Sequence, residues 1–153
     1  MTTPTPDTEM VLTRVFDAPR ELVYRAFVDP EQLAQWFGPV GYSVPVNTVV
    51  VEPRAGGKYH LTMVSEDGTD SSPITSVLTE VVENELLVGA QEWDGVDGLQ
   101  GPSKVRMRIE FHDEEGARTR VVIRQGPFTK EVSEMTSDGW ESSFTKLDTL
   151  LAA

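Results

Sequence analysis

The alternation of apolar and polar residues between about residues 42 and 125 is the feature that most constrains how this chain folds. A period of two is typical of strands with one buried face, and turn residues such as Gly68 and Gly116 separate the runs. No helical pattern in this region is long enough to connect parallel strands, so the sequence predicts hairpins in an antiparallel meander. The strands that we expect are residues 42–52, 57–64, 74–82, 86–93, 103–112 and 117–125.

Helical patterns occur only outside this region, after a first strand expected at residues 9–16. Pro19 suits the first position of a helix, where its missing N–H has no partner to lose, and Asp29 is expected to cap a second short helix. An amphipathic pattern predicts a long final helix over residues 131–152. Its apolar stripe consists of Met135, Trp140, Phe144, Leu147 and Leu151. Because Gly139 costs a helix about 1 kcal/mol relative to Ala, we expect close approach to a neighbouring strand to compensate.

This order of elements predicts one α+β domain over residues 9–153, preceded by a disordered tip at residues 1–8. A strongly twisted antiparallel sheet of six or seven strands tends to curl, and the long C-terminal helix would fill its concave side. Residues 94–104 contain three glycines and a proline, which is typical of a mobile loop at the rim. A cavity is expected between the helix and the sheet.

Composition excludes several classes of function. The chain has 25 acidic residues against 13 lysines and arginines, a formal charge of −12 that repels nucleic acid and anionic membranes. The absence of cysteine excludes disulfides, thiolate metal sites and thiol nucleophiles. The first eight residues have neither a basic segment nor an apolar run, so we expect a cytoplasmic protein that does not insert into membranes.

The two histidines, His60 and His112, do not form a recognisable metal or catalytic motif. His60 would be able to orient or protonate a ligand, although a single histidine without a placed carboxylate is more often structural. His112 lies beside an acidic turn and is expected to be solvated. No carboxylates have the spacing of a metal site and no serine has a triad context, so we expect neither a metal nor a cofactor.

Aromatic and methionine side chains are the best candidates for a binding site, because they suit the wall of a cavity for a flat or flexible apolar molecule. With His60 added as a polar group, the candidate ligand-binding residues are Trp36, Phe37, Tyr59, His60, Met63, Trp93, Met107, Phe128, Met135 and Trp140. The alternative is that these side chains form an ordinary filled core.

Arginines alternate with apolar residues on the last predicted hairpin. Five of them share the outward phase: Arg106, Arg108, Arg118, Arg120 and Arg124. They would form either a site for an acidic partner or a solvated face paired with carboxylates, of which the second is the commoner arrangement. Arg54 would either grip a carboxylate of a ligand or form a half-buried pair with Glu52.

Six short segments, taken in order, resemble one known family. They are residues 16–23, residues 29–33, Trp36-Phe37-Gly38-Pro39, residues 52–59, residues 66–68 and Asp138-Gly139-Trp140. Together they resemble the activators of heat-shock protein 90 ATPase and their small bacterial relatives, in the START-related, Bet v 1-like (SRPBCC) superfamily. The resemblance implies a helix-grip fold. The chain departs from the usual pattern at Glu52, where many relatives have Asp, and at Ser76, where many have Gly.

The resemblance leaves three hypotheses for the function, since relatives include carriers of apolar molecules, chaperone co-factors and relatives of polyketide cyclases. The leading hypothesis is a non-catalytic binder of a small apolar molecule. The second is a stress-related protein-interaction module that modulates a heat-shock ATPase, although the chain has no room for the additional N-terminal domain of the eukaryotic activators. The third is an enzyme of the cyclase or hydrolase type that uses His60 with a carboxylate.

Overall fold

A computed structural model describes residues 9–93 and 103–152 of the chain. The expected N-terminal tip at residues 1–8, and residues 94–102 of the expected rim loop, lie outside these ranges. The elements are β1 (Met10–Phe16), α1 (Arg20–Val28), α2 (Pro30–Trp36), β2 (Tyr42–Ser43), the 3-10 helix η2 (Val46–Thr48), β3 (Val50–Val51), β4 (Lys58–Ser65), β5 (Ser71–Val82), β6 (Leu86–Trp93), β7 (Ser103–Glu114), β8 (Arg118–Gly126) and α3 (Lys130–Ala152).

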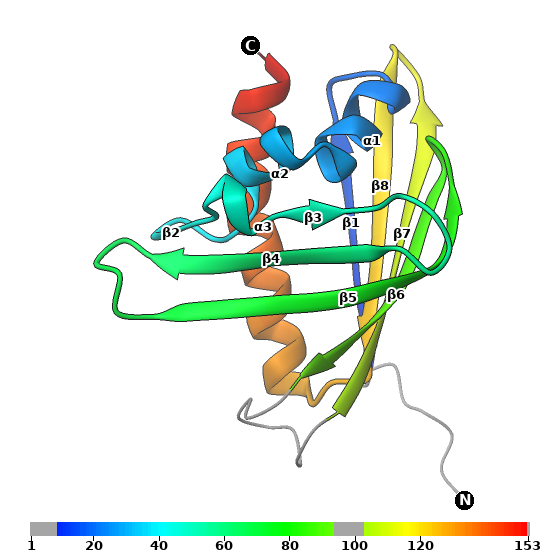
Figure 1. Ribbon diagram of the computed structural model, residues 1–153. Helices are drawn as coiled ribbons and strands as arrows, with labels where there is room; N and C mark the ends of the chain where they lie inside the picture. The colour runs from blue at the N-terminus through cyan, green and yellow to red at the C-terminus, as the bar shows by residue number, and fades with distance from the viewer. Residues whose placement is uncertain (1–8, 94–102, 153) are drawn as a thin grey trace, which may run out of the picture.

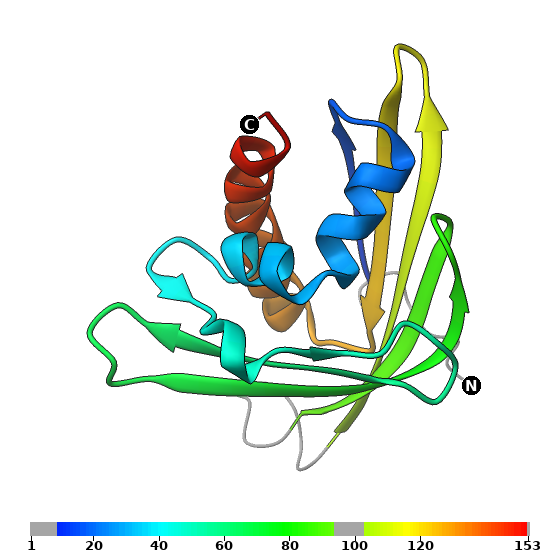
Figure 2. The same cartoon turned by 45° about the horizontal axis from the view of Figure 1, so that its top comes forward.

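The strands form one antiparallel sheet in the order β1-β8-β7-β6-β5-β4-β2, with β3 paired to β4. The consecutive strands from β4 to β8 are neighbours in the sheet, which confirms the meander predicted from the period of two. The sheet curls strongly around α3, while α1 and α2 lie across the open side of the curve (Figures 1 and 2). The helix-grip architecture is therefore confirmed.

The prediction of a single strand over residues 42–52 is wrong. This segment divides into two short strands with a 3-10 turn between them, because Pro45 has no N–H for a strand ladder. The carbonyl of Pro45 instead accepts hydrogen bonds from the backbone N–H of Thr48 at 2.9 Å and from its hydroxyl at 2.7 Å. The segment consequently forms a broken edge of the sheet beside β4.

The two short helices begin close to where the sequence predicts. Asp29 caps α2 as predicted, and its carboxylate accepts a hydrogen bond from the N–H of Glu31 at 3.0 Å. Pro19 precedes α1 as its N-cap instead of occupying the first helical position. The indole N–H of Trp36 donates to the carbonyl of Ala26 at 2.8 Å, and this bond ties the end of α2 to the end of α1.

The long helix buries the stripe formed by Trp140, Phe144 and Leu147, as predicted. The prediction that Met135 belongs to the same buried stripe is wrong, because its side chain is 57% exposed. Met135 lies near the beginning of α3, where the helix edge meets solvent instead of the packed core. None of the helices in the described ranges combines the length and hydropathy that a membrane crossing requires.

Gly57 lies where the fold leaves no room for a side chain. A Cβ atom at this position would lie 2.0 Å from the carbonyl oxygen of Glu52. We therefore expect Gly57→Ala to lower the free energy of unfolding by about 3 kcal/mol, the upper range for overpacking. Urea unfolding checks this value. Gly56→Ala is the matched control, because no atom lies within 4 Å of a Cβ at this position and only its φ of +83° is unfavourable. Its loss in the free energy of unfolding should be about half as large or less.

Candidate functional site

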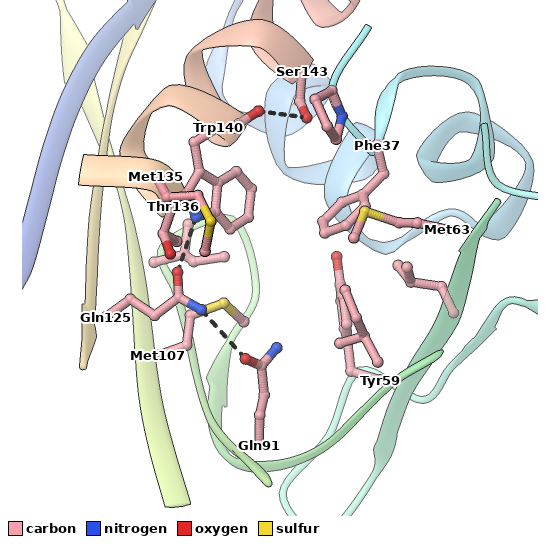
Figure 3. A pocket seen from close by; sticks show the side chains of 16 residues that line it. Phe37, Tyr59, Met63, Gln91, Met107, Gln125, Met135, Thr136, Trp140 and Ser143 are labelled. Atoms are coloured by element: carbon pink, nitrogen blue, oxygen red, sulfur yellow. Dashed lines mark hydrogen bonds between the residues drawn. The ribbon is translucent and has the colours of Figure 1, made fainter. Parts of the chain in front are cut away.

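A cavity of about 230 Å³ lies between the concave face of the sheet and α3. Most of its wall is apolar, and the side chains come from β4 to β8, from the turn after α2 and from one face of α3 (Figure 3). The lining residues are Phe37, Gly38, Pro39, Tyr59, Leu61, Met63, Ile74, Gln91, Met107, Ile109, Gln125, Met135, Thr136, Gly139, Trp140 and Ser143. The expected cavity between helix and sheet is therefore present.

Alternate side chains of β4 point to opposite faces of the sheet, and one of the two sets faces this cavity. Tyr59, Leu61 and Met63 line it, so His60 belongs to the opposite face of the strand. His60 does not line the cavity, and the hypothesis that it orients or protonates a ligand there is wrong. The reason is the period of two, which turns each neighbour of Tyr59 away from the interior.

The structure brings six of the ten predicted binding residues to the cavity: Phe37, Tyr59, Met63, Met107, Met135 and Trp140. Trp36 and Phe128 are buried but do not line the cavity, and they belong to the hydrophobic core. The ring centroid of Trp36 lies 4.8 Å from that of Phe27 and 6.0 Å from that of Phe144. Trp93 ends β6, and its side chain lies outside the described part of the structure.

Two glutamines that the sequence analysis missed provide the main polar feature of the cavity. The indole N–H of Trp140 donates to Oε1 of Gln125 at 2.9 Å, and Nε2 of Gln125 donates to Oε1 of Gln91 at 3.3 Å (Figure 3). Both glutamines are buried, with 6% and 4% exposure for Gln91 and Gln125. The signal in the sequence was available, because each glutamine falls on the inward phase of a predicted strand.

Tyr59 contributes the face of its ring to the cavity and keeps its hydroxyl engaged elsewhere. The phenol donates to the carbonyl of Phe27 at 2.5 Å. Burial raises the pKa of Tyr59 far above its ordinary value, and the nearby Tyr24 adds to the shift. The phenol is therefore neutral across the physiological range and serves as a fixed wall instead of an acid or base.

On the helix side, the cavity exists because the residues of α3 that face it include small ones. A Cβ atom at Gly139 would meet nothing within 4 Å beyond the helix itself, so the prediction that a neighbouring strand approaches closely here is wrong. Gly139 instead faces the cavity beside Trp140 and Ser143. Ser143 stays compact because its hydroxyl donates to the carbonyl of Gly139 at 2.9 Å.

The outward-facing arginines of the last hairpin form a solvated, mixed-charge face. Arg108 pairs with Glu110 at 2.7 Å, and Arg120 pairs with Glu114 at 3.0 Å. Arg124 pairs with Glu9 at 3.5 Å. Arg118 donates instead to the backbone carbonyl of Glu115 at 2.8 Å. Three of the five arginines thus pair with carboxylates, as the solvated alternative expects.

The expected pair between Arg54 and Glu52 is present, with 3.8 Å between the charged atoms, but the expectation that it is half-buried is wrong, because the Arg54 side chain is 67% exposed. The main contact of Glu52 is the backbone N–H of Lys58, which donates to its carboxylate at 3.0 Å and lowers its pKa. Glu52 therefore holds the turn between β3 and β4 together through the backbone.

Apart from Tyr59, the titratable side chains of the described residues lie outside the cavity wall. His112 lies 2.9 Å from Glu110 on the exposed hairpin, and hydrogen bonds from Arg108 and His112 lower the pKa of the Glu110 carboxyl. Within residues 9–93 and 103–152, no three His, Asp or Glu side chains are grouped so that they would hold a metal ion.

The sequence matches a family model described as "Activator of Hsp90 ATPase homolog 1-like protein" over residues 17–152. A search of curated proteins found no match to this chain.

Several solved structures have the same fold over nearly their whole length. Protein CV1439 from Chromobacterium violaceum is 26% identical, with a TM-score of 0.81 over 95% of this chain and 98% of that one. The AHSA1 protein from Silicibacter pomeroyi is 23% identical, with a TM-score of 0.79 over 94% of this chain and 97% of that one. Protein Ms6760 from Mycobacterium smegmatis is 22% identical, with a TM-score of 0.75 over 95% and 92% of the two chains.

The open surroundings of Gly139 lead to a prediction about stability. Gly139→Ala should raise the free energy of unfolding by about 0.5–1 kcal/mol, because alanine favours the helix and its methyl group meets no neighbour. Urea unfolding measures the gain. Gly68→Ala serves as the contrast: its surroundings are equally open, but its φ of +76° should make the change destabilising. A loss of stability in Gly139→Ala would show that this position is packed.

Proposed function

The chain belongs to the Activator of Hsp90 ATPase homolog 1-like family, and we propose that it binds a small apolar molecule in the cavity between its sheet and α3. The observation that carries the proposal is the apolar wall around a space of about 230 Å³. An engineered cavity of about 150 Å³ is large enough for benzene, so this space suits one or two rings. Filling it would remove apolar surface of both partners from water.

The energy of such binding comes mainly from burial. A ligand that hides about 200 Å² of apolar surface gains roughly 5 kcal/mol, from which the entropic cost of association is subtracted. Contacts with Met63, Met107 and Met135 suit a ligand of variable shape, since unbranched methionine side chains adapt to irregular surfaces. Met135 borders the cavity and is also exposed to solvent.

The described lining does not favour catalysis. General acid–base chemistry needs a group whose pKa lies near the working pH. Tyr59 is the one titratable side chain among the sixteen lining residues, and its hydroxyl is bonded to a backbone carbonyl. With His60 outside the cavity, the cyclase or hydrolase hypothesis loses the residue on which it was built.

Blocking the cavity from the helix side tests the proposal. Gly139→Leu should weaken binding of a neutral fluorescent probe such as N-phenyl-1-naphthylamine, because the new side chain projects into the space beside Trp140. Fluorescence titration should show a saturable signal for the wild type and at least a tenfold weaker one for the variant.

The matched control is Asp138→Leu, which adds the same side chain one residue earlier on an exposed position of α3. This variant should bind the probe like the wild type. Unfolding curves will show whether both variants remain folded. Equal binding by Gly139→Leu and the wild type, or no saturable binding of any apolar probe, would contradict the proposal.

Interaction with a heat-shock ATPase is a second candidate function, which the description of the family favours. If the chain acts in this way, stoichiometric amounts should raise the ATPase rate of the purified heat-shock protein 90 of the same organism at least twofold. A coupled ATPase assay with the specific inhibitor of that chaperone as a blank measures the effect. An unchanged rate together with no co-elution in gel filtration would rule this candidate out.

A further inference from the structure

The hydrogen bonds at the polar end of the cavity have a fixed direction. An indole N–H only donates, so the atom of Gln125 that faces Trp140 must be its carbonyl oxygen. The amide nitrogen of Gln125 then faces Gln91, and the atom of Gln91 that receives it must be an oxygen. Trp140 therefore determines the orientation of both amides.

The consequence is that Gln91, the third member of this chain of hydrogen bonds, accepts through its oxygen and has its amide nitrogen on the other branch of the side chain. This nitrogen is turned toward the space between Gln91 and Tyr59 (Figure 3). An amide nitrogen carries two N–H groups, so it is able to donate to a ligand alongside another partner. The polar end of the cavity thus presents a donor.

A second observation concerns the buried hydroxyl of Ser76 on β5. Ser76 lies directly opposite Tyr59 on β4 and opposite Gln91 on β6 in the sheet register. Its side chain is 1% exposed, and its hydroxyl has no hydrogen-bond partner among the described residues. A buried hydroxyl without a partner is unfavourable. Ser76 is not among the lining residues, but Tyr59 and Gln91, its neighbours in the sheet, both line the cavity.

The lining carries no charged side chain, and this limits the chemical class of the ligand further. The sixteen lining residues include no lysine, arginine, histidine, aspartate or glutamate. An ionised carboxylate would enter without a counter-charge, at a desolvation cost that hydrocarbon burial does not offset, and the net charge of −12 would oppose it as well. An ammonium group would meet the donor end of the chain instead of an acceptor.

The shape of the space favours a planar group. Trp140 and Met135 form one wall, and Tyr59, Phe37 and Met63 form the opposite one, with Gln91 at the base between them (Figure 3). Aromatic rings on two sides stack well against flat molecules.

We propose that the ligand is an uncharged, planar molecule of one or two rings with a hydrogen-bond acceptor, such as a ketone oxygen, that meets the amide of Gln91. The inference rests on the proposed function, because it concerns the same cavity. Gln91 would contact the ligand, whereas Gln125 and Trp140 are positioning residues that orient its amide.

Calorimetric titration with three naphthalenes of similar size tests the inference: 2-acetylnaphthalene, 2-ethylnaphthalene and 2-naphthoate. The decisive quantity is the affinity ratio between the ketone and the ethyl compound, compared between wild type and Gln91→Leu. In the variant, this ratio should be roughly fivefold to tenfold lower than in the wild type, as expected for the loss of one hydrogen bond. The carboxylate should bind at least tenfold more weakly than the ketone at pH 7.

Three further variants separate a specific contact from a general disturbance. Gln91→Met keeps the length of the side chain without the donor and should repeat the effect if Gln91→Leu folds poorly. Gln35→Leu is the matched control on α2, outside the cavity, and should leave the ratio unchanged. Trp140→Phe frees the amides to reverse, so the ketone should lose part of its relative affinity although the ring remains.

Ketone binding by the wild type should also be constant between pH 5 and 9, since the raised pKa of Tyr59 leaves the described lining without a group that titrates there. An unchanged ratio in both Gln91 variants, or equal binding of carboxylate and ketone, would overturn this inference while leaving the proposed function intact. Failure of all three compounds to bind the wild type would overturn both.

Discussion

The buried C-terminal end of α1 is the point on which the rest of the structure depends. The last carbonyl groups of a helix have no partner within it, and here they lie inside the curl of the sheet, away from water. The carbonyl of Ala26 accepts from the indole of Trp36 on α2, and that of Phe27 accepts from the phenol of Tyr59 on β4. Two aromatic side chains thus join both short helices to the sheet, and loss of either bond would leave a buried carbonyl unsatisfied.

The same contacts determine which aromatic groups border the cavity. Trp36 turns inward to reach α1 and becomes part of the core, whereas Tyr59 presents its ring to the open space while its hydroxyl is held. The helix side remains hollow because Gly139 and Ser143 are small where α3 passes the sheet. A binding space therefore arises where the packing of bulky residues ends, between a rigid aromatic cluster and a helix face of small residues.

Much of this architecture was predictable because it depends on short periods in the sequence. The period of two across residues 42–125 predicted the meander, and the 3.6-residue period predicted α3 with its buried Trp140 and Phe144. The errors arose where a single residue outweighed the pattern. Pro45 interrupted an expected strand, and Met135 had the spacing of the stripe but lies where the helix leaves the core. Six of ten predicted site residues line the cavity, because aromatic and methionine side chains favour both cores and cavity walls.

The sequence by itself determined the class of fold, the antiparallel order of the strands and the long C-terminal helix, since each follows from local periodicity, turns and caps. Only the tertiary structure decided that Tyr59 rather than His60 faces inward, that Gln91 and Gln125 meet Trp140, and that Gly139 borders open space. The physical reason is that these features depend on contacts between residues far apart in the chain. Alternation indicates that one face of a strand is buried, but the packing of distant elements decides which face, and how much room remains.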